Sequence, residues 1–511
     1  MSTHDHASAF HRIIIVGGGT AGWMAAAALS RTFGPNKSIE LIESDEIGTV
    51  GVGEATIPAI KNFHLLLGLD EAEFLRAVNG TFKLGIQFEN WGQLGDRYFH
   101  PFGPPGADSW AAQFHHYWLK AQSVGEVSPF NDFSPEACLA KAGRFGMEGD
   151  RKPNYAYHFD AGLYAQLLRR LSEVWGVKRT EGKVVDVHLH SESGLIDSVT
   201  LASGQTVAGD FFIDCSGFRG LLIEQALKAG WEDWSGWLRS DSAVAVQTES
   251  VTPPSPYTRA TARSAGWQWK IPLQHRVGNG LVYCSEYMDD EQAKRVLLDH
   301  VDGPTITEPR QLKFTTGRRL LQWSRNCLAL GLSSGFLEPL ESTSIHMIQN
   351  SLIRFIKLFP ADHIEPVEVA QFNEDVRLEF ERIRDFIILH YHVNQRTDSP
   401  YWTSLREMAI PESLAHKIEL FKTNARVFRD QYELFAEQSW VVVLLGQGIM
   451  PTGFHPIVNN LSADDMRGFL EKTRADIEHM VSQQPSHQAY LHHLLQKPSA
   501  MASSVASTNA R

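Results

Sequence analysis

The chain has 511 residues and a formal net charge of −12 at pH 7, with 43% hydrophobic and 21% charged residues. These proportions are ordinary for a globular protein, and the length allows a large core in two interwoven lobes. The acidic balance disfavours nucleic acids and anionic membranes, which attract basic surfaces. No apolar run is long enough to span a membrane, and residues 1–12 lack the apolar core of a signal peptide. We therefore expect a cytoplasmic protein that acts on a small molecule.

Metal binding and disulfide bonding are not indicated. The four cysteines are scattered, with no C-x-x-C pair. This pattern suggests neither a zinc site nor a disulfide framework and suits a reducing compartment. His115 and His116 are adjacent on a predicted helix over 109–122, so they point to different faces and do not form a metal site.

The stretch 13–22 reads I-I-I-V-G-G-G-T-A-G, which predicts a strand, a tight turn and a helix. Gly17, Gly19 and Gly22 have the G-x-G-x-x-G spacing, which permits the turn, the approach of a pyrophosphate and close helix packing. The phosphates would lie over free N–H groups at the helix start. A second predicted strand ends in Glu43, where an acid accepts hydrogen bonds from a ribose. The pattern predicts a dinucleotide-binding fold and leaves FAD and NAD undecided.

Later segments extend this organisation. Two glycines and a proline in 49–58 suit a segment that lies flat against a ligand, although a connecting loop has the same composition. The apolar run 211–219 returns to the first sheet, which implies a discontinuous cofactor domain. Further strands are predicted over 243–249, 266–273 and 280–287 and build a second sheet. From 367 onward helical patterns dominate, including 367–394 and 462–483.

Three features carry candidate chemistry. The run 81–91 alternates as a strand does and puts Lys83 on a face with small and polar groups, where a lysine is by default solvent-exposed. Trp267 and Trp269 share one face of a strand, as core residues or as the walls of an aromatic site. A helix is predicted to begin at 342–344. Its free amides would favour an anion and keep Glu341 ionised, and a simple N-cap at this position is the alternative.

Five motifs occur in the order found in flavin-dependent tryptophan halogenases, and the chain resembles that family from residue 12 to about 451. They are G-G-G-T-A-G-W at 17–23, V-G-E-A-T-I-P at 52–58, F-K-L-G at 82–85, W-x-W-x-I-P at 267–272 and E-P-L-E-S-T at 338–343. The tryptophan motif is typical of halogenases and not of the related hydroxylases.

The resemblance implies an α/β fold: an FAD-binding, Rossmann-like box of the aromatic-hydroxylase type with a mostly helical region that covers the substrate. The predicted regions are a discontinuous FAD box with an inserted substrate sheet over 1–360, a helical region over 361–484 and a largely disordered tail over 485–511. The residues implied for FAD are Gly17, Gly19, Thr20, Ala21, Gly22 and Glu43 at the ADP half, Val52, Gly53, Glu54 and Ala55 as a strap over the ring, and Leu332 and Ile345 at the flavin.

The resemblance also implies a reaction. FADH2 from a separate flavin reductase is used with oxygen and a halide ion to make hypohalous acid, which travels to an aromatic substrate. The backbone of Thr343 and Ser344 would bind the halide. Lys83 would hydrogen-bond the oxidant or form a haloamine, and Glu341 would polarise the oxidant or take the ring proton. On this basis Lys83 is expected in a closed pocket, charge-paired with Glu341. Trp267 and Trp269 would separate flavin from substrate. A homodimer is compatible with the resemblance.

Two departures from the family pattern refine the expectation. The chain has Ser344 where the family has glycine, which alters the backbone approach to the halide and leads us to predict a bromide preference. The region 422–448 lacks the tyrosine pair that clamps free tryptophan. His100 and Phe102 still match a pair that sandwiches indole, so indole-type substrates are predicted. The alternatives are a flavin-dependent hydroxylase and a non-catalytic flavin-binding protein.

Overall fold

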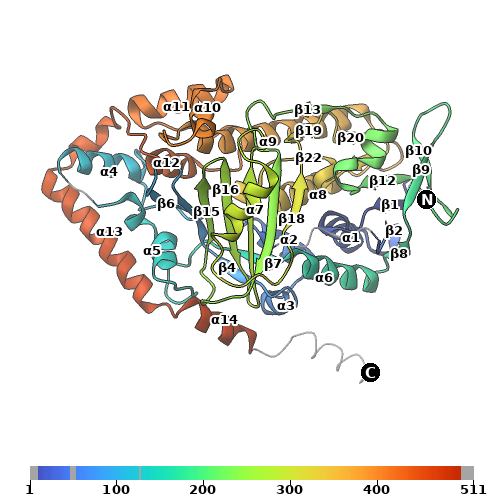
Figure 1. The fold of residues 1–511 in the computed structure, drawn as a ribbon, viewed down its shortest axis with the longest axis horizontal. Coiled ribbons are helices and arrows are strands. Elements are labelled where there is room, and N and C mark those ends of the chain that lie inside the picture. The colour runs from blue at the N-terminus through green and yellow to red at the C-terminus, as the bar shows by residue number, and fades with distance from the viewer. Residues whose placement is uncertain (1–9, 47–52, 126–127, 497–511) are drawn as a thin grey trace, which may run out of the picture.

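The computed structural model describes residues 10–46, 53–125 and 128–496 (Figure 1). Its first sheet has six strands in the order β20-β21-β12-β1-β2-β8. These strands are β1 (Arg12–Val16), β2 (Ser38–Glu43), β8 (Lys178–Glu181), β12 (Phe211–Asp214), β20 (Trp323–Ser324) and β21 (Cys327–Ala329). β1 pairs in parallel with both β2 and β12. The predicted return of residues 211–219 to the first sheet is therefore confirmed.

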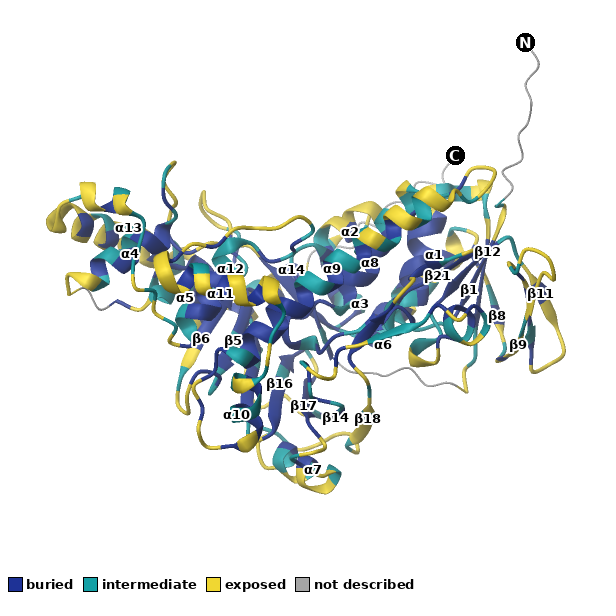
Figure 2. Cartoon of the chain, turned by 90° about the horizontal axis from the view of Figure 1, so that it is seen from above, coloured by how far each residue is buried: buried dark blue, intermediate teal, exposed yellow. Residues whose placement is uncertain are grey.

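Helix α1 (Thr20–Phe33) is the central helix against this sheet. Its residues from Gly22 to Ser30 are all buried. It contacts α6 (Ala161–Val174) and α8 (Ser344–Lys357) as well as β1 and β2. A helix that is apolar all round must be covered on every side, and α1 and β1 lie in the dark blue interior of Figure 2.

The second sheet has seven strands in the order β18-β14-β17-β16-β15-β5-β6. They are β5 (Gly85–Glu89), β6 (Arg97–Pro101), β14 (Ser242–Thr248), β15 (Thr258–Arg263), β16 (Gly266–Pro272), β17 (Val277–Tyr283) and β18 (Arg310–Lys313). Nearly all of β14, β16 and β17 is buried, so these strands are covered on both faces. The predicted second sheet is confirmed.

The single strand predicted over 81–91 is wrong in one respect, because the structure divides it between two sheets. β4 (Thr81–Lys83) belongs to a three-stranded sheet, in the order β3-β7-β4, with β3 (Gly53–Ala55) and β7 (Ala156–Asp160). β5 begins two residues later in the large sheet. Between them, Leu84 donates its N–H to the carbonyl of Pro256 at 2.8 Å and not to either sheet. Lys83 thus lies at the junction of two sheets.

Two small sheets and a series of helices complete the described fold. The sheets comprise β9 (Val184–Leu189), β10 (Ile196–Leu201) and β11 (Thr206–Ala208), and β13 (Trp231–Asp233), β19 (Gly317–Arg319) and β22 (Gly335–Phe336). The earlier helices are α2 (Ile60–Leu67), α3 (Glu71–Ala77), α4 (Phe114–Ser123), α5 (Pro135–Lys141) and α7 (Asp290–Leu298). The later ones are α9 (Pro366–His392), α10 (Pro400–Glu407), α11 (Glu412–Asn424), α12 (Glu437–Gly446) and α13 (Ala463–Gln483).

The largely disordered tail predicted from residue 485 is wrong over its first part. Residues His487–Leu495 form helix α14, and Ser486 caps it by accepting from the N–H of Ala489 at 3.2 Å. His487, Leu491 and Leu494 are buried along one side, at the spacing of a helix face. Residues 497–511 lie outside the described part. The division into regions at 360 and 484 stays a prediction.

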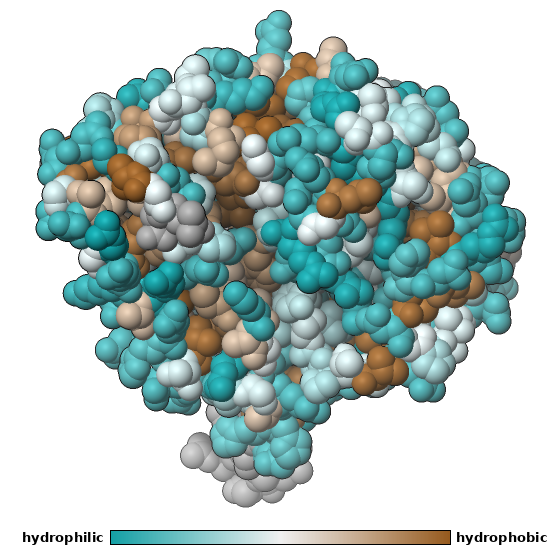
Figure 3. All heavy atoms as spheres, turned by 60° about the vertical axis from the view of Figure 1, so that its left-hand side comes forward, coloured by the Kyte–Doolittle hydropathy of each residue, from teal (hydrophilic) through white to brown (hydrophobic). Residues whose placement is uncertain are grey.

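The face of the molecule shown in Figure 3 is mostly polar, with apolar residues gathered in patches between the polar ones. Within the described residues, none of the helices has the length and apolarity that crossing a lipid bilayer requires. The same residues contain no grouping of three histidine, cysteine, aspartate or glutamate side chains suited to a metal ion.

Candidate active site

The glycine turn between β1 and α1 combines two crowded positions with one open position. A Cβ atom on Gly17 would lie 2.2 Å from the carbonyl oxygen of Cys215, and one on Gly22 would lie 1.8 Å from that of Gly17. A Cβ on Gly19 would meet no atom within 4 Å. No side chain caps the start of α1, where Thr20 and Ala21 lie. The open space over uncapped amides fits a pyrophosphate.

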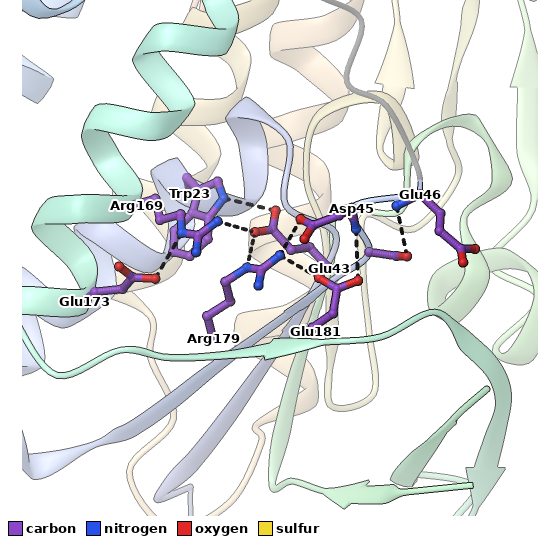
Figure 4. A network of polar contacts seen from close by, with 9 residues as sticks. Trp23, Glu43, Asp45, Glu46, Arg169, Glu173, Arg179 and Glu181 are labelled. Atoms are coloured by element: carbon purple, nitrogen blue, oxygen red, sulfur yellow. Dashed lines mark hydrogen bonds and ion pairs between the residues drawn. The ribbon is translucent and has the colours of Figure 1, made fainter. Parts of the chain in front are cut away.

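Glu43 lies beside this turn at the end of β2 (Figure 4). Its Oε1 accepts from Nε of Arg179 at 2.6 Å and from Nη1 of Arg169 at 3.4 Å, and its Oε2 accepts from Nε1 of Trp23 at 3.3 Å. A Cβ atom on Gly18 would lie only 1.5 Å from Oε2. The acid predicted from its spacing is therefore next to the turn, held by two arginines and an indole.

Three further segments implied for the flavin converge on the same region. Gly331 has φ +66°, and its added Cβ would lie 2.8 Å from the Cβ of Ala21, so Leu332 follows directly where α1 begins. Ile345 is buried in the first turn of α8, which contacts α1. Gly53 and Ala55 are buried in β3, whereas Val52 lies outside the described residues. Burial raises the pKa of Glu54, between them, to about 7.

Lys83 is completely buried, so the solvent-exposed reading of the strand pattern is wrong. Its Nζ donates to the carbonyl of Thr56 at 3.0 Å and to Oγ of Ser342 at 2.8 Å. The ring centroid of Phe102 lies 5.1 Å from the same nitrogen. Burial lowers the pKa of Lys83 to about 7, with the charge of Glu341 acting in the opposite direction. A large fraction of the amine is therefore neutral at physiological pH.

The predicted ion pair between Lys83 and Glu341 is not formed, since no ion pair in the described residues joins them within 4.0 Å. Glu341, 1% exposed, instead lies against His100 on β6, whose Nδ1 is 3.0 Å from both carboxylate oxygens. His390 on α9 places Nε2 at 2.7 Å from Oε1, outside hydrogen-bond geometry. Two imidazoles surround the carboxylate, so it acts on Lys83 only through space.

The chain reaches α8 through a strained residue. Ser342 has φ +59° and ψ +38°, a left-handed conformation that costs a non-glycine residue about 1–2 kcal/mol. This conformation turns its hydroxyl towards Lys83 immediately before the helix starts at Ser344. Thr343 occupies the N-cap position, yet no side chain caps α8. Its buried Oγ1 has no hydrogen-bond partner among the described residues. The predicted helix start is confirmed.

The two tryptophans of β16 are both buried, and a hydrogen bond to Glu338 fixes the ring of Trp267. Nε1 of Trp267 donates to Oε2 of Glu338 at 3.0 Å, and the hydroxyl of Tyr391 donates to the same oxygen. The ring centroids of Trp267 and Trp269 are 6.1 Å apart. Trp269 lines a cavity of about 210 Å³ that Gly53 also borders. Trp269 therefore faces the segment implied as the flavin strap, while Trp267 is fixed to a buried acid.

We call the group formed by Lys83, His100, Glu341 and Ser342 the lysine chamber, and several residues around it were not predicted from the sequence. The rings of Phe386 and Phe435 stack at 3.9 Å and 20°, and their centroids lie 5.8 and 6.2 Å from that of His100. Phe386 and His390 are one helical turn apart in the predicted helix 367–394, a spacing that places them on one face. The roles of the Thr56 carbonyl and the Ser342 hydroxyl have no comparable signal in the sequence.

Comparisons with known proteins find similar sequences and structures over most of the chain. The tryptophan halogenase family model matches residues 12–463. The 7-chloro-L-tryptophan 6-halogenase KtzR of Kutzneria sp. is 36% identical, over 94% of this chain and 98% of its own length. Two flavin-dependent halogenases have similar structures. Xcc4156 from Xanthomonas campestris has a TM-score of 0.94 at 50% identity and covers 96% of this chain and 99% of its own. BrvH from Brevundimonas sp. BAL3 has a TM-score of 0.91 at 44% identity and covers 95% and 99%.

Proposed function

Because the chain belongs to the tryptophan halogenase family and is a flavin-dependent halogenase, we propose that it halogenates an electron-rich, indole-like aromatic beside Lys83. The observation that carries this proposal is the burial of the Lys83 amine between Thr56 and Ser342. These two residues belong to separate motifs, V-G-E-A-T-I-P and E-P-L-E-S-T, far apart in the chain. A buried lysine without a carboxylate contact is costly, and such groups are concentrated at functional sites.

The glycine turn supplies the FAD site in this proposal. Gly17, Gly19 and Gly22 would hold the ADP half, with Glu43 near the ribose and the Gly53–Ala55 strand near the ring. Bound FAD, reduced by a separate flavin reductase, would supply the oxygen-activating chemistry that oxidises a halide to hypohalous acid. All four cysteines are free thiols, which suits the proposed cytoplasmic setting.

The amides at the start of α8 are the proposed halide site. Thr343 and Ser344 begin a 14-residue helix without a side-chain cap, so their N–H groups and the positive helix end favour an anion. The unpaired Oγ1 of Thr343 offers a further donor. Bromide costs less to desolvate than chloride and is easier to oxidise, and Ser344 adds a side chain beside the backbone. We therefore propose that bromide is preferred.

Lys83 and Glu341 have separate proposed roles. A neutral amine has two N–H donors, which match the two acceptors around Nζ. In the proposed step its lone pair attacks the halogen of hypohalous acid, so the nitrogen–halogen bond forms as the halogen–oxygen bond breaks. The released hydroxide takes one N–H proton from the nitrogen and leaves as water. A protonated amine would instead hydrogen-bond the oxidant. In this proposal Glu341 takes the proton that leaves the ring after halogenation, and the contact with His100 orients its carboxylate.

The surroundings of Phe435 favour indole over free tryptophan. The segment between α11 and α12 carries Phe435, whose ring stacks on Phe386 of α9, and both rings lie beside His100. Glu433, two residues before Phe435, accepts from Nζ of Lys417 with both oxygens at 2.8 Å. This acid is already paired and is unsuited to bind the ammonium group of an amino acid. A substrate without charged groups avoids the cost of removing an unpaired ammonium group from water.

The decisive experiment is mass spectrometry of products formed with FAD, a flavin reductase, NADH and oxygen. Indole and tryptophan are offered in parallel, with bromide, chloride or both. We expect mainly brominated indole. Mainly chlorinated product would overturn the halide preference, and faster reaction of tryptophan would overturn the substrate proposal. Oxygenated product without halide would indicate a hydroxylase, and FAD binding without any product would indicate a non-catalytic flavin-binding protein.

A further inference from the structure

The strand that carries Lys83 is an edge strand. Among the described strands, β4 pairs only with β7, at the end of the order β3-β7-β4. Residues two apart in a strand point their N–H groups to the same side. Phe82 and Leu84 therefore present their N–H groups along one edge, and Leu84 donates to the carbonyl of Pro256 at 2.8 Å. An unpaired buried N–H of Phe82 would cost free energy, so that edge needs a second acceptor.

The imidazole of His487 supplies this acceptor. The N–H of Phe82 donates to Nε2 of His487 at 3.2 Å, and Nδ1 of the same ring lies 2.8 Å from the carbonyl of Pro254. A backbone N–H can only donate and a carbonyl can only accept, so the proton lies on Nδ1 and Nε2 is the acceptor. Burial lowers the pKa of His487 to about 4, which keeps the ring neutral at physiological pH. The ring thus connects Phe82 of β4 to the segment 254–256. Two residues further along the chain, Leu84 bonds directly to Pro256 of the same segment.

Helix α14 is fixed so that this ring stays in place. The N–H of His487 donates to the carbonyl of Gly143 at 2.9 Å, and that of Phe145 donates to Pro485 at 3.2 Å. The ring of Phe82 stacks on Phe145 at 4.0 Å and 15°, and Tyr490 of α14 lies edge-on at 5.6 Å. The C-terminal end is held by Nε of Arg76, which donates to Leu495 at 3.1 Å. The contacts concentrate around the residue directly before Lys83.

We propose that His487 is a positioning residue for Lys83, which fixes the edge of β4 and thereby the place of the amine in the chamber. The inference rests on the proposed function, in which Lys83 reacts with the oxidant. It also assigns a role to α14, a helix that lies beyond residues 12–463 of the family match. His487 touches neither the amine nor the chamber, so its effect is on geometry.

Two substitutions of similar size separate the two hydrogen bonds. The amide of His487→Asn reaches the position of Nδ1 and keeps the bond to Pro254, whereas that of His487→Gln reaches the position of Nε2 and keeps the acceptor for Phe82. We expect His487→Asn to lower kcat roughly tenfold or more, since a misplacement near 1 Å can cost about a hundredfold. KM and FAD affinity should stay unchanged, and His487→Gln should recover most of kcat. The matched control is His493→Ala, an exposed position on the same helix.

Amide hydrogen exchange of a peptide covering 81–84 gives a readout that does not depend on activity. It should be faster in His487→Asn than in the wild type and restored in His487→Gln. Faster exchange with unchanged kcat would overturn the proposal, as would a folded Gln variant with restored exchange and no recovery of kcat. Losses of FAD affinity and kcat together would show a merely structural role. Full activity of Lys83→Ala would instead defeat the proposed function, so the two failures are distinguishable.

Discussion

The glycine turn and the lysine chamber differ in how the chain forms them. The turn is one continuous stretch that contains three consecutive glycines, and the open space above Gly19 is the proposed place for the pyrophosphate. The chamber is assembled from distant segments, with Lys83 on β4, His100 on β6 and Ser342 before α8. An added atom should therefore damage the turn, whereas a removed group should damage the chamber.

The two regions also differ in how their charged side chains are paired. Glu43 beside the turn is partly exposed and pairs directly with Arg179 and Arg169, and its hydrogen bond with Arg179 raises the pKa of that guanidinium. Lys83 is buried without a direct carboxylate partner among the described residues, and burial lowers its pKa to about 7. The first arrangement is a set of direct ion pairs beside the proposed ribose position. The second keeps an amine close to its protonation midpoint, as proton-transfer and nucleophilic chemistry at neutral pH requires.

Loss of the amine should give the largest effect. We expect Lys83→Ala to lower product formation by about 10²–10⁴-fold, the contribution typical of a positioned catalytic group, without weakening FAD binding. Product is measured by chromatography with mass detection, and FAD affinity by quenching of flavin fluorescence. Lys141→Ala removes a lysine that is 81% exposed and serves as the control. Retained halogenation in Lys83→Ala would show that the chamber is not the reaction site.

Methyl groups added at the turn should have smaller effects, and these effects should be on FAD affinity, which Lys83→Ala leaves unchanged. Gly19→Ala meets no protein atom within 4 Å, so the melting temperature without FAD should be unchanged while FAD affinity falls roughly tenfold or more. Gly22→Ala places Cβ 1.8 Å from the carbonyl of Gly17 and should lower the melting temperature as well. Calorimetry of both apoproteins and titration with FAD make the comparison. Equal affinities for FAD in wild type and Gly19→Ala would contradict a pyrophosphate site at this turn.

The sequence was informative about the turn because its requirements are local. Spacing alone predicted that Gly17, Gly19 and Gly22 lie where β1 turns into α1, and the β-branched residues identified β1. The chamber gave no such signal. A two-residue period assigns Lys83 to a face but does not reveal what covers that face, so the exposed interpretation followed by default. Only the resemblance to halogenases predicted a buried lysine.

The details of the chamber show a further limit of sequence reasoning. A buried lysine and a nearby acid suggest an ion pair. In the structure, however, Glu341 contacts His100, and Lys83 donates to Thr56 and Ser342. Such pairings depend on which atoms meet where two sheets and the segment before α8 come together, and residue types do not encode this. The tail was misjudged for a related reason, because its polar composition concealed the buried side of α14, which includes His487.

The smallest predicted effect is the dependence of halogenation on pH. If the neutral amine of Lys83 takes the halogen, kcat should rise with pH and reach half its maximum near 7, because the amine loses its proton there. The same lowered pKa predicts that the free energy of unfolding rises with pH between about 7 and 10.5, where the unfolded chain still binds that proton and the folded chain does not. Lys83→Ala should lose this dependence in urea titrations. A kcat that falls as the pH passes through 7 would show that the ammonium form acts, by donating a hydrogen bond to the oxidant. Oxidation of reduced flavin, measured over the same range, separates either outcome from changes in the supply of oxidant.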